Sequence, residues 1–137
     1  MAFRPYLAFK GNCREAFNRY QAIFGGDLVL LSFSDAPPTE TTPPPGTGPD
    51  AVMHAALTTG EQLLMGADAP PGAFEGSVNG ICVNYSTSDV TNAERVFGAL
   101  AENGQVQMQI GPTFFSPAFG MCIDRFGVPW MISTDQS

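Results

Sequence analysis

The spacing of apolar residues along the chain separates it into strands, helices and loops. Tyr6 to Lys10 is a short extended stretch that ends at Gly11. The next segment, 16–24, gathers apolar residues on one broad face, which predicts an amphipathic helix. Asn12 followed by Glu15 has the spacing of an N-cap with its capping-box partner, and Gly25-Gly26 is a typical helix end.

Strands and loops alternate after this helix. Segment 27–34 reads as a strand buried on both sides, or nearly so, and 51–59 with 61–67 reads as a hairpin around Thr59-Gly60. Segment 35–50 is rich in Pro, Thr and Gly and is expected to be either a lid or an unstructured loop. A second Pro/Gly stretch, 68–76, is predicted to separate two halves.

The second half repeats the order of the first. A strand over 78–85 precedes a helix that Ser88-Asp89 caps, and Asn103-Gly104 ends that helix. Extended segments follow at 106–110, 113–115, 119–123 and 128–133. The pattern predicts an α+β fold of two βαβββ modules, 1–70 and 76–137, in a single domain, 1–137. Their sheets are expected to form a curved, half-open barrel around a cavity, with the helices outside.

Composition and charge exclude several classes of binding partner. The net charge of −7 and the lack of any basic run argue against nucleic acid and anionic membranes. No apolar run is long enough to span a bilayer, and the chain begins without a signal-peptide pattern. Three widely spaced cysteines, Cys13, Cys82 and Cys122, are interpreted as small buried residues in a reducing cytoplasm.

Several motifs together resemble one family. They are Pro5 to Asn12, Phe24-Gly25-Gly26, Met53 to Leu57, Leu64 to Asp68, Thr113 to Phe115 and Asp124 to Ile132. The chain resembles the PhnB-like branch of the vicinal-oxygen-chelate superfamily, which includes glyoxalase, bleomycin-resistance and dioxygenase proteins. The resemblance covers nearly the whole chain. It implies the paired βαβββ fold, a homodimer and a cavity for a small molecule.

The resemblance also implies where a metal ion would lie, because metal enzymes of the superfamily hold a divalent ion on four inward positions. Those positions look like Pro5, Met65, Gly80 and Met131 here, and none is a good ligand for such an ion. We therefore expect no metal and no cofactor. Some relatives carry a demethylubiquinone-methyltransferase label, but this sequence lacks a glycine-rich loop of the kind that holds S-adenosylmethionine.

Individual side chains offer few candidates for chemistry. His54 is the only histidine, so it is the candidate acid–base residue or else a polar anchor. Asp68 is expected at the cavity rim, whereas Asp124 is expected to cap its own turn. Cys82 and Asn84 share a strand face with Gly80. The predicted ligand-binding set is Phe9, Phe33, His54, Met65, Asp68, Cys82, Asn84, Phe114, Trp130 and Met131.

Three functions remain open from the sequence. The favoured one is a metal-free, PhnB-like protein that binds a small apolar or aromatic molecule. The alternative is a lyase or isomerase of the glyoxalase type, which uses non-standard metal ligands or His54 as an acid–base group. The third is a dimer with a purely structural role.

Overall fold

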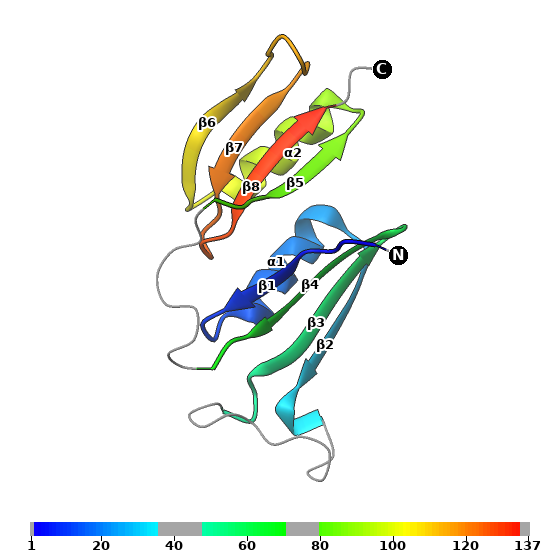
Figure 1. The fold of residues 1–137 in the computed structure, drawn as a ribbon, viewed down its shortest axis with the longest axis vertical. Coiled ribbons are helices and arrows are strands. Elements are labelled where there is room, and N and C mark those ends of the chain that lie inside the picture. Colours follow the sequence, from blue (N-terminus) through cyan, green and yellow to red (C-terminus); the bar gives the residue numbers. More distant parts are fainter. Residues whose placement is uncertain (1, 36–47, 71–79, 135–137) are drawn as a thin grey trace. The chain divides into compact units, whose positions relative to one another are not determined.

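The computed structural model describes residues 2–35, 48–70 and 80–134, and within them two series of elements follow the same order (Figure 1). The chain divides into two units, Met1–Gly76 (unit 1) and Ser77–Ser137 (unit 2). Unit 1 contains β1 (Tyr6–Phe9), α1 (Cys13–Phe24), β2 (Asp27–Ser32), a 3-10 turn (Phe33–Asp35), β3 (Val52–Thr59) and β4 (Gln62–Asp68). Unit 2 contains β5 (Val83–Thr87), α2 (Val90–Ala101), β6 (Gln105–Gly111), β7 (Phe119–Ile123) and β8 (Pro129–Thr134).

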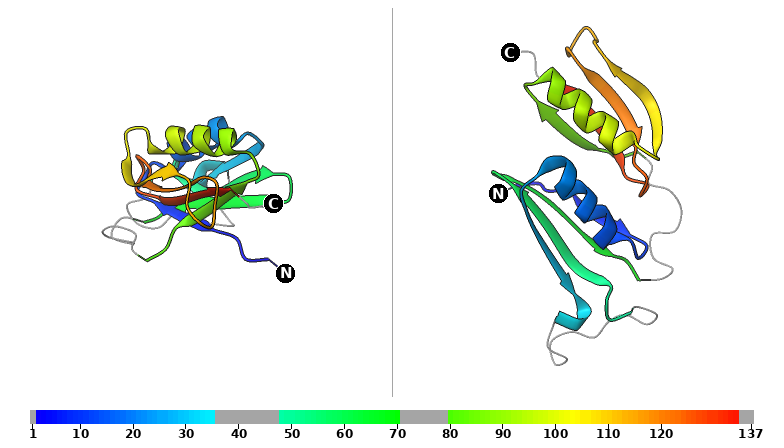
Figure 2. Two further views of the ribbon diagram at one scale, coloured as in Figure 1. Left: turned by 90° about the horizontal axis from the view of Figure 1, so that it is seen from above. Right: turned by 180° about the vertical axis from the view of Figure 1, so that it is seen from behind.

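Each unit builds one four-stranded sheet with the same topology. The strand order is β1-β4-β3-β2 in unit 1 and β5-β8-β7-β6 in unit 2. The first strand of each unit runs parallel to the last, and the other pairs are antiparallel. In each unit the helix lies along one face of its own sheet (Figure 2). The predicted α+β fold of two βαβββ modules is confirmed.

The core of unit 1 lies between α1 and its sheet. Phe17 and Tyr20 are fully buried, and their rings meet edge to face with centroids 5.5 Å apart. Phe17 packs directly over Gly66 of β4, where a Cβ atom would lie 2.7 Å from its Cε2 atom. A glycine is therefore required at this point for the helix to approach the sheet.

The core of unit 2 likewise lies between its helix and its sheet. Ala93, Val96, Phe97 and Leu100 are buried on α2. The ring of Phe97 lies over Gly120 of β7, where a Cβ atom would be 2.8 Å from its Cε2 atom. The apolar spacing that predicted both helices therefore identified the side chains that they bury.

Two local predictions about helix starts have different outcomes. Asp89 caps α2 as predicted, because its carboxylate accepts a hydrogen bond of 3.0 Å from the Thr91 amide. Asn12 makes no side-chain cap at α1, so that prediction is wrong. The carboxylate of Asp68 accepts from the Cys13 amide instead, at 3.0 Å. A residue from the last strand of the unit thus takes the place of the local cap.

Other expectations about strands need correction. Segment 27–34 is not buried on both sides, because Val29 is 51% exposed and alternates with half-buried neighbours. Residues 113–115 form a turn rather than a strand, since the Thr113 hydroxyl accepts from the amides of Phe115 and Ser116. The proline-rich segment and the second linker lie mostly outside the described residues, at 36–47 and 71–79.

Neither helix in the described parts of the chain is long and apolar enough to cross a membrane.

Candidate functional site

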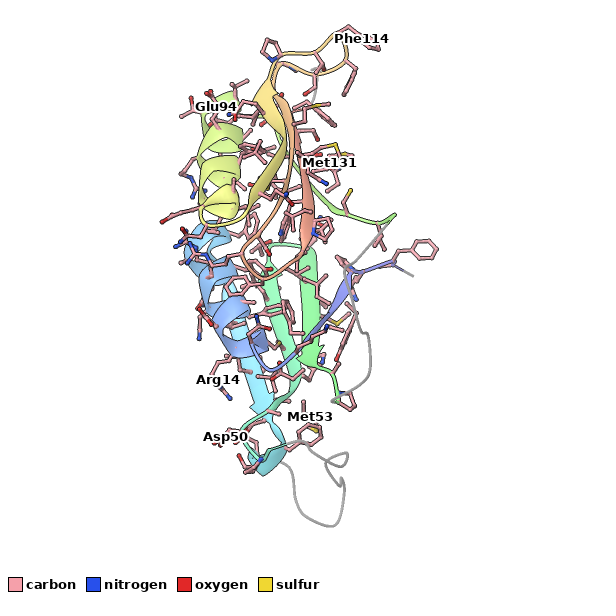
Figure 3. All side chains as sticks on the ribbon, turned by 90° about the vertical axis from the view of Figure 1, so that its left-hand side faces the viewer. Arg14, Asp50, Met53, Glu94, Phe114 and Met131 are labelled. Atoms are coloured by element: carbon pink, nitrogen blue, oxygen red, sulfur yellow. The ribbon has the colours of Figure 1, made fainter. Side chains whose placement is uncertain are left out.

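The face of each sheet that is turned away from its helix carries most of the polar and half-exposed side chains of interest. Successive residues of a strand point to opposite faces, so the register assigns every position to one side. We call this side the helix-free face of each unit. Figure 3 shows Met131 on that side of the unit 2 sheet, opposite α2.

On the helix-free face of unit 1, Tyr6 and His54 form a hydrogen-bonded pair. The Tyr6 hydroxyl lies 3.1 Å from Nδ1 of His54, and the ring centroids are 5.8 Å apart. Tyr6 comes from β1 and His54 from β3, so their side chains meet across the intervening strand β4. Burial raises the pKa of the Tyr6 phenol, and the Cys13 thiol adds a smaller effect in the same direction.

Apolar side chains surround this pair. Met65 of β4 is directly opposite Tyr6, and Leu31 of β2 is directly opposite His54. Ala56 and Val29 continue the same face toward the edge of the sheet. The polar pair is therefore placed among apolar side chains that are partly exposed.

The helix-free face of unit 2 carries a row of methionines. Met108, Met121 and Met131 lie opposite one another on β6, β7 and β8, and Asn84 of β5 ends the row. Met121 and Met131 are half-buried, while Met108 is 47% exposed. Methionine side chains are flexible and polarizable, so such a row can adapt to differently shaped apolar surfaces.

A short polar network borders the methionine row. Asn84 Nδ2 donates to Ser86 Oγ over 3.2 Å, and Ser86 Oγ lies 2.9 Å from Ser133 Oγ. Ser133 Oγ in turn donates to Asn84 Oδ1 over 3.3 Å. The three side chains close a ring of hydrogen bonds that fixes their orientation beside Met131.

Aromatic rings gather at the turn between β6 and β7. Phe115 meets Phe119 edge to face at 5.0 Å and Phe114 at 5.2 Å. Phe114 is 95% exposed and lies at the tip of this turn (Figure 3).

Two of the predicted aromatic site residues lie on the opposite side of their sheets. Phe9 is 3% exposed and packs edge to face on Phe17 of α1. Trp130 is 2% exposed, on the same face as Cys122 and Ile132. Both belong to the cores under the helices, which corrects their assignment as binding-site walls. Phe33 is half-buried in the 3-10 turn after β2.

The two candidate aspartates hold backbone in place. Asp68 accepts from the amides of Gly11, Cys13 and Val52 at 3.1, 3.0 and 2.9 Å. Its carboxylate thus satisfies the start of α1 and the start of β3, and its expected role at a cavity rim stays a prediction. Asp124 caps its own turn as predicted, through the Phe126 and Val128 amides, both at 2.9 Å. It also accepts from the Trp130 indole at 2.9 Å.

The cysteines differ in their surroundings. Burial raises the pKa of Cys13 to about 12, with the Asp68 charge adding to the shift and Arg14 opposing it. Burial also raises the pKa of Cys122 to about 11, with help from the Asp124 charge. Neither thiol is therefore a nucleophile at neutral pH. Cys82 is half-buried and lies immediately before β5.

The register revises the positions that correspond to the metal ligands of the superfamily. Pro5 precedes β1 and Gly80 precedes β5, whereas the first-strand residues opposite Met65 and Met131 are Tyr6 and Asn84. The revised set offers a neutral phenol, an amide and two thioethers, which do not fit a divalent first-row ion. The described residues also hold no cluster of three or more His, Cys, Asp or Glu side chains placed to bind a metal.

A separate open depression of about 670 Å³ lies beside the start of α1 in unit 1. Its walls are Gly11, Asn12, Arg14, Glu15, Asn18, Asp50, Ala51 and Asp68. These walls contain no aromatic side chain, and the Asp68 carboxylate within them is already bonded to backbone amides. The depression therefore differs in character from the predicted aromatic cavity.

The sequence reasoning missed several polar residues of the helix-free faces. Tyr6, Ser86 and Ser133 were not among the predicted site residues. Ser133 alternates with the buried Ile132 and Thr134, and that alternation was an available signal, whereas Tyr6 and Ser86 have no buried neighbour in sequence. The contact between Tyr6 and His54 depends on two strands that pair only through a third, and no local pattern reveals it.

The topology and the two helix-free faces define the class of protein. A parallel pairing of first and last strands, repeated in two βαβββ units, is the fold of the glyoxalase/bleomycin resistance superfamily, and solved structures of that superfamily share it.

Comparison with known proteins specifies the family. A model described as 3-demethylubiquinone-9 3-methyltransferase matches residues 1–133, and the chain belongs to this PhnB-like family. It is 35% identical to the protein YjdN of Escherichia coli over 140 residues, which cover 97% of this chain and 95% of YjdN.

Two solved structures support the same assignment. Protein PA1353 from Pseudomonas aeruginosa has a TM-score of 0.88 and 42% identity, with 100% of this chain and 99% of that chain covered. A PhnB protein from Bacillus cereus has a TM-score of 0.77 and 25% identity, with 98% and 99% covered.

Proposed function

We propose that this protein binds a small, largely apolar or aromatic molecule on its helix-free sheet faces, without the divalent metal of its superfamily. The observation that carries the proposal is the repeated arrangement on those faces. In both units a half-buried methionine of the last strand lies opposite a polar residue of the first strand, Met65 opposite Tyr6 and Met131 opposite Asn84.

The chemistry of these faces suits such a ligand. Small-molecule sites are mostly apolar and contain a few oriented polar groups. The methionine row and Phe119 offer apolar contact in unit 2, and the Asn84–Ser86–Ser133 network offers oriented polar atoms beside it. Unit 1 offers Met65 and Leu31 beside the Tyr6–His54 pair.

The methyl-transfer activity in the family description is not part of the proposal. The turn from β1 to α1 has a single glycine, Gly11. Its amide and that of Cys13 already donate to the Asp68 carboxylate. The backbone donors that a phosphate- or nucleotide-binding loop would offer a ligand at this point are therefore engaged inside the protein.

Binding of an aromatic molecule to the helix-free faces can be tested directly by NMR of labelled methionine, with indole as the probe. Protein with ¹³C-methyl methionine is titrated with indole and followed by NMR, and we expect the methyl signals of Met65, Met121 and Met131 to shift. Met131→Ala should weaken binding roughly fourfold, as expected for the loss of about one methylene of apolar contact. Val90→Ala, on the surface of α2, is the control that should leave affinity unchanged.

Two results would contradict the proposal. The first is that neither indole nor any comparable aromatic compound shifts these methyl signals. The second is that protein purified without chelator and reloaded with nickel, zinc or manganese holds one tightly bound ion per chain by elemental analysis. Such an ion would restore the lyase or isomerase alternative.

We further propose that the protein is a cytoplasmic homodimer. Exposed apolar side chains support a partner, because Phe3 is fully exposed and Phe114 is 95% exposed. The three cysteines are free thiols, in keeping with a reducing compartment. Light scattering coupled to size-exclusion chromatography measures the molar mass in solution. A mass of one chain at high protein concentration would contradict the dimer.

A further inference from the structure

The hydrogen bond between Tyr6 and His54 has a defined direction. A phenol hydroxyl is a better donor than an imidazole N–H, and a bare imidazole nitrogen is a better acceptor than a phenol oxygen. A phenol with a pKa of about 10 keeps its proton at neutral pH. The phenol therefore donates, Nδ1 of His54 accepts over 3.1 Å, and the ring hydrogen of the neutral imidazole is on Nε2.

The strand register explains how the two side chains reach each other. Ala67 of β4 lies opposite Ala8 of β1, and continuing the β3–β4 register places Ala67 next to His54. A methyl group at this position leaves room for the phenol to pass over β4. The pair is therefore joined by its hydrogen bond and ring contact while solvent still reaches it, since Tyr6 is 53% exposed.

We propose that Tyr6 holds neutral His54 in the Nε2–H tautomer, so that Nε2–H donates a hydrogen bond to an acceptor oxygen of the ligand. This inference rests on the proposed binding function and specifies its ligand class, an apolar molecule with a carbonyl or carboxylate oxygen. Among the residues that the structure describes, no side chain or backbone group accepts from Nε2. The apolar neighbours Leu31 and Met65 lower the local polarity, which strengthens a hydrogen bond made there.

This arrangement selects against other roles for His54. An ammonium ligand has only N–H donors and would place them against the Nε2–H donor, so the pair disfavours a cationic ligand despite the net charge of −7. General-base catalysis needs a free ring nitrogen, and Nδ1 is taken by Tyr6 while Nε2 carries the hydrogen. The pair is thus a polar anchor that distinguishes ligands by their acceptor oxygen.

The tautomer can be measured without any ligand. His54 is the only histidine, so ¹⁵N labelling of histidine gives one pair of ring signals. At a pH well above the usual titration range of imidazoles, we expect a protonated Nε2 and an unprotonated Nδ1 in the full-length protein. Tyr6→Phe should move the signals toward a mixture of tautomers, and Tyr85→Phe, which removes a phenol in unit 2, should not. A proton on Nδ1, or no change in Tyr6→Phe, would overturn the inference.

The ligand class is tested with three probes of similar shape, acetophenone, benzoate and ethylbenzene. We expect acetophenone, benzoate or both to shift the Nε2 signal, and ethylbenzene to leave it in place. His54→Ala should weaken binding of the oxygen probes relative to ethylbenzene by roughly 2- to 13-fold, the range of one net hydrogen bond. Preference for acetophenone identifies a neutral acceptor, and preference for benzoate identifies a carboxylate.

Failure of the inference differs from failure of the proposed function. If ethylbenzene binds as well as both oxygen probes, and His54→Ala has no selective effect, the donor role is wrong while apolar binding stands. If none of the three probes binds, the proposed function fails and the donor role fails with it.

Discussion

The two units solve one packing problem with glycines on different strands. Phe17 is the fifth residue of α1 and Phe97 is the eighth residue of α2, and each ring needs a residue without a side chain beneath it. Unit 1 places that glycine on β4, at Gly66, and unit 2 places it on β7, at Gly120. The two units therefore share the contact of a helix phenylalanine with a sheet glycine, but they make it at different positions of the helix and of the sheet.

The aspartates of the two units differ in the same way. Asp68 accepts from three backbone amides in two separate segments of unit 1, Gly11 and Cys13 at the start of α1 and Val52 at the start of β3. Asp124 bonds within a stretch of seven residues in unit 2, from its own position to Trp130. The Asp68 carboxylate therefore makes long-range hydrogen bonds, and the Asp124 carboxylate makes local ones.

The largest expected effect is that of Asp124→Ala, which should reduce the free energy of unfolding by about 3 kcal/mol or more. Asp124 is 4% exposed, and its removal leaves buried donors without partners, each costing about 1–3 kcal/mol. Asp68→Ala should cost less, about 1–2 kcal/mol, because Asp68 is partly exposed and water can replace it. Urea unfolding measures both free-energy changes. An equal or larger cost for Asp68→Ala would contradict the expectation that the buried carboxylate of Asp124 contributes more to stability.

The glycine variants should come next. We expect Gly66→Ala and Gly120→Ala each to lose about 1–3 kcal/mol of stability, because the added methyl would overlap Phe17 or Phe97. Gly98→Ala is the matched control, since it is exposed on α2 with open space around it. It should be neutral or stabilising by up to about 1 kcal/mol. Trimming the ring with Phe17→Leu should relieve part of the Gly66→Ala loss, and strict additivity would show that the two residues do not clash.

The two buried thiols should lower the free energy of unfolding over different ranges of alkaline pH. Below the ordinary thiol pKa of 9.0, both thiols are protonated in the folded and unfolded chain, so they add no pH dependence. Above that value the unfolded chain releases protons that the fold retains, and stability falls by about 1.4 kcal/mol per pH unit for each thiol. Cys122 contributes up to about pH 11 and Cys13 up to about pH 12.

Stability curves against pH measure this effect. Cys13→Ala should reduce the slope between pH 11 and 12, where the raised pKa of Tyr6 also contributes, and Cys122→Ala should reduce the slope only at lower pH. A slope unchanged in Cys13→Ala would show that other groups cause the alkaline loss.

The smallest expected effect concerns the helix-free face. Ser133→Ala should change stability by no more than about 0.5 kcal/mol, because its hydrogen bonds are exposed to water. Ser116→Ala, the buried comparison in the same unit, should cost about 1–3 kcal/mol, because its hydroxyl bonds Thr134 and Ala118 out of contact with water. Thermal unfolding measures both, and a large loss for Ser133→Ala would make the polar network structural rather than available for binding.

Much of the fold could be predicted because it rests on local patterns. The apolar spacing on the two helices, the Asp89 cap and the Asp124 turn all depend on residues a few positions apart, and each was predicted. The α1 cap was missed because Asp68 is 55 residues from Cys13. The prediction of a strand over residues 113–115 was wrong because the Thr113 hydroxyl accepts from the amides two and three residues ahead and closes a turn.

The site was predicted less completely than the fold. His54 was singled out as the only histidine, Met65 and Met131 through the family resemblance, and Asn84 from the face of its strand; all four lie on the helix-free faces, and their role in binding stays a prediction. Phe9 and Trp130 were misplaced because aromatic character alone does not say which side of a sheet a residue faces. Tyr6 was missed because its partner is 48 residues away on a strand that it does not touch.

The hydrogen bonds of Asp68 also bear on the order in which the chain becomes structured. The start of α2 is satisfied by Asp89, which is already beside it when the helix forms. The start of α1 is satisfied by a carboxylate at the end of β4, so this helix gains its cap only when the final strand of its unit has closed the sheet. Early helix in the folding chain should therefore appear in unit 2, and α1 should become protected from hydrogen exchange together with β4.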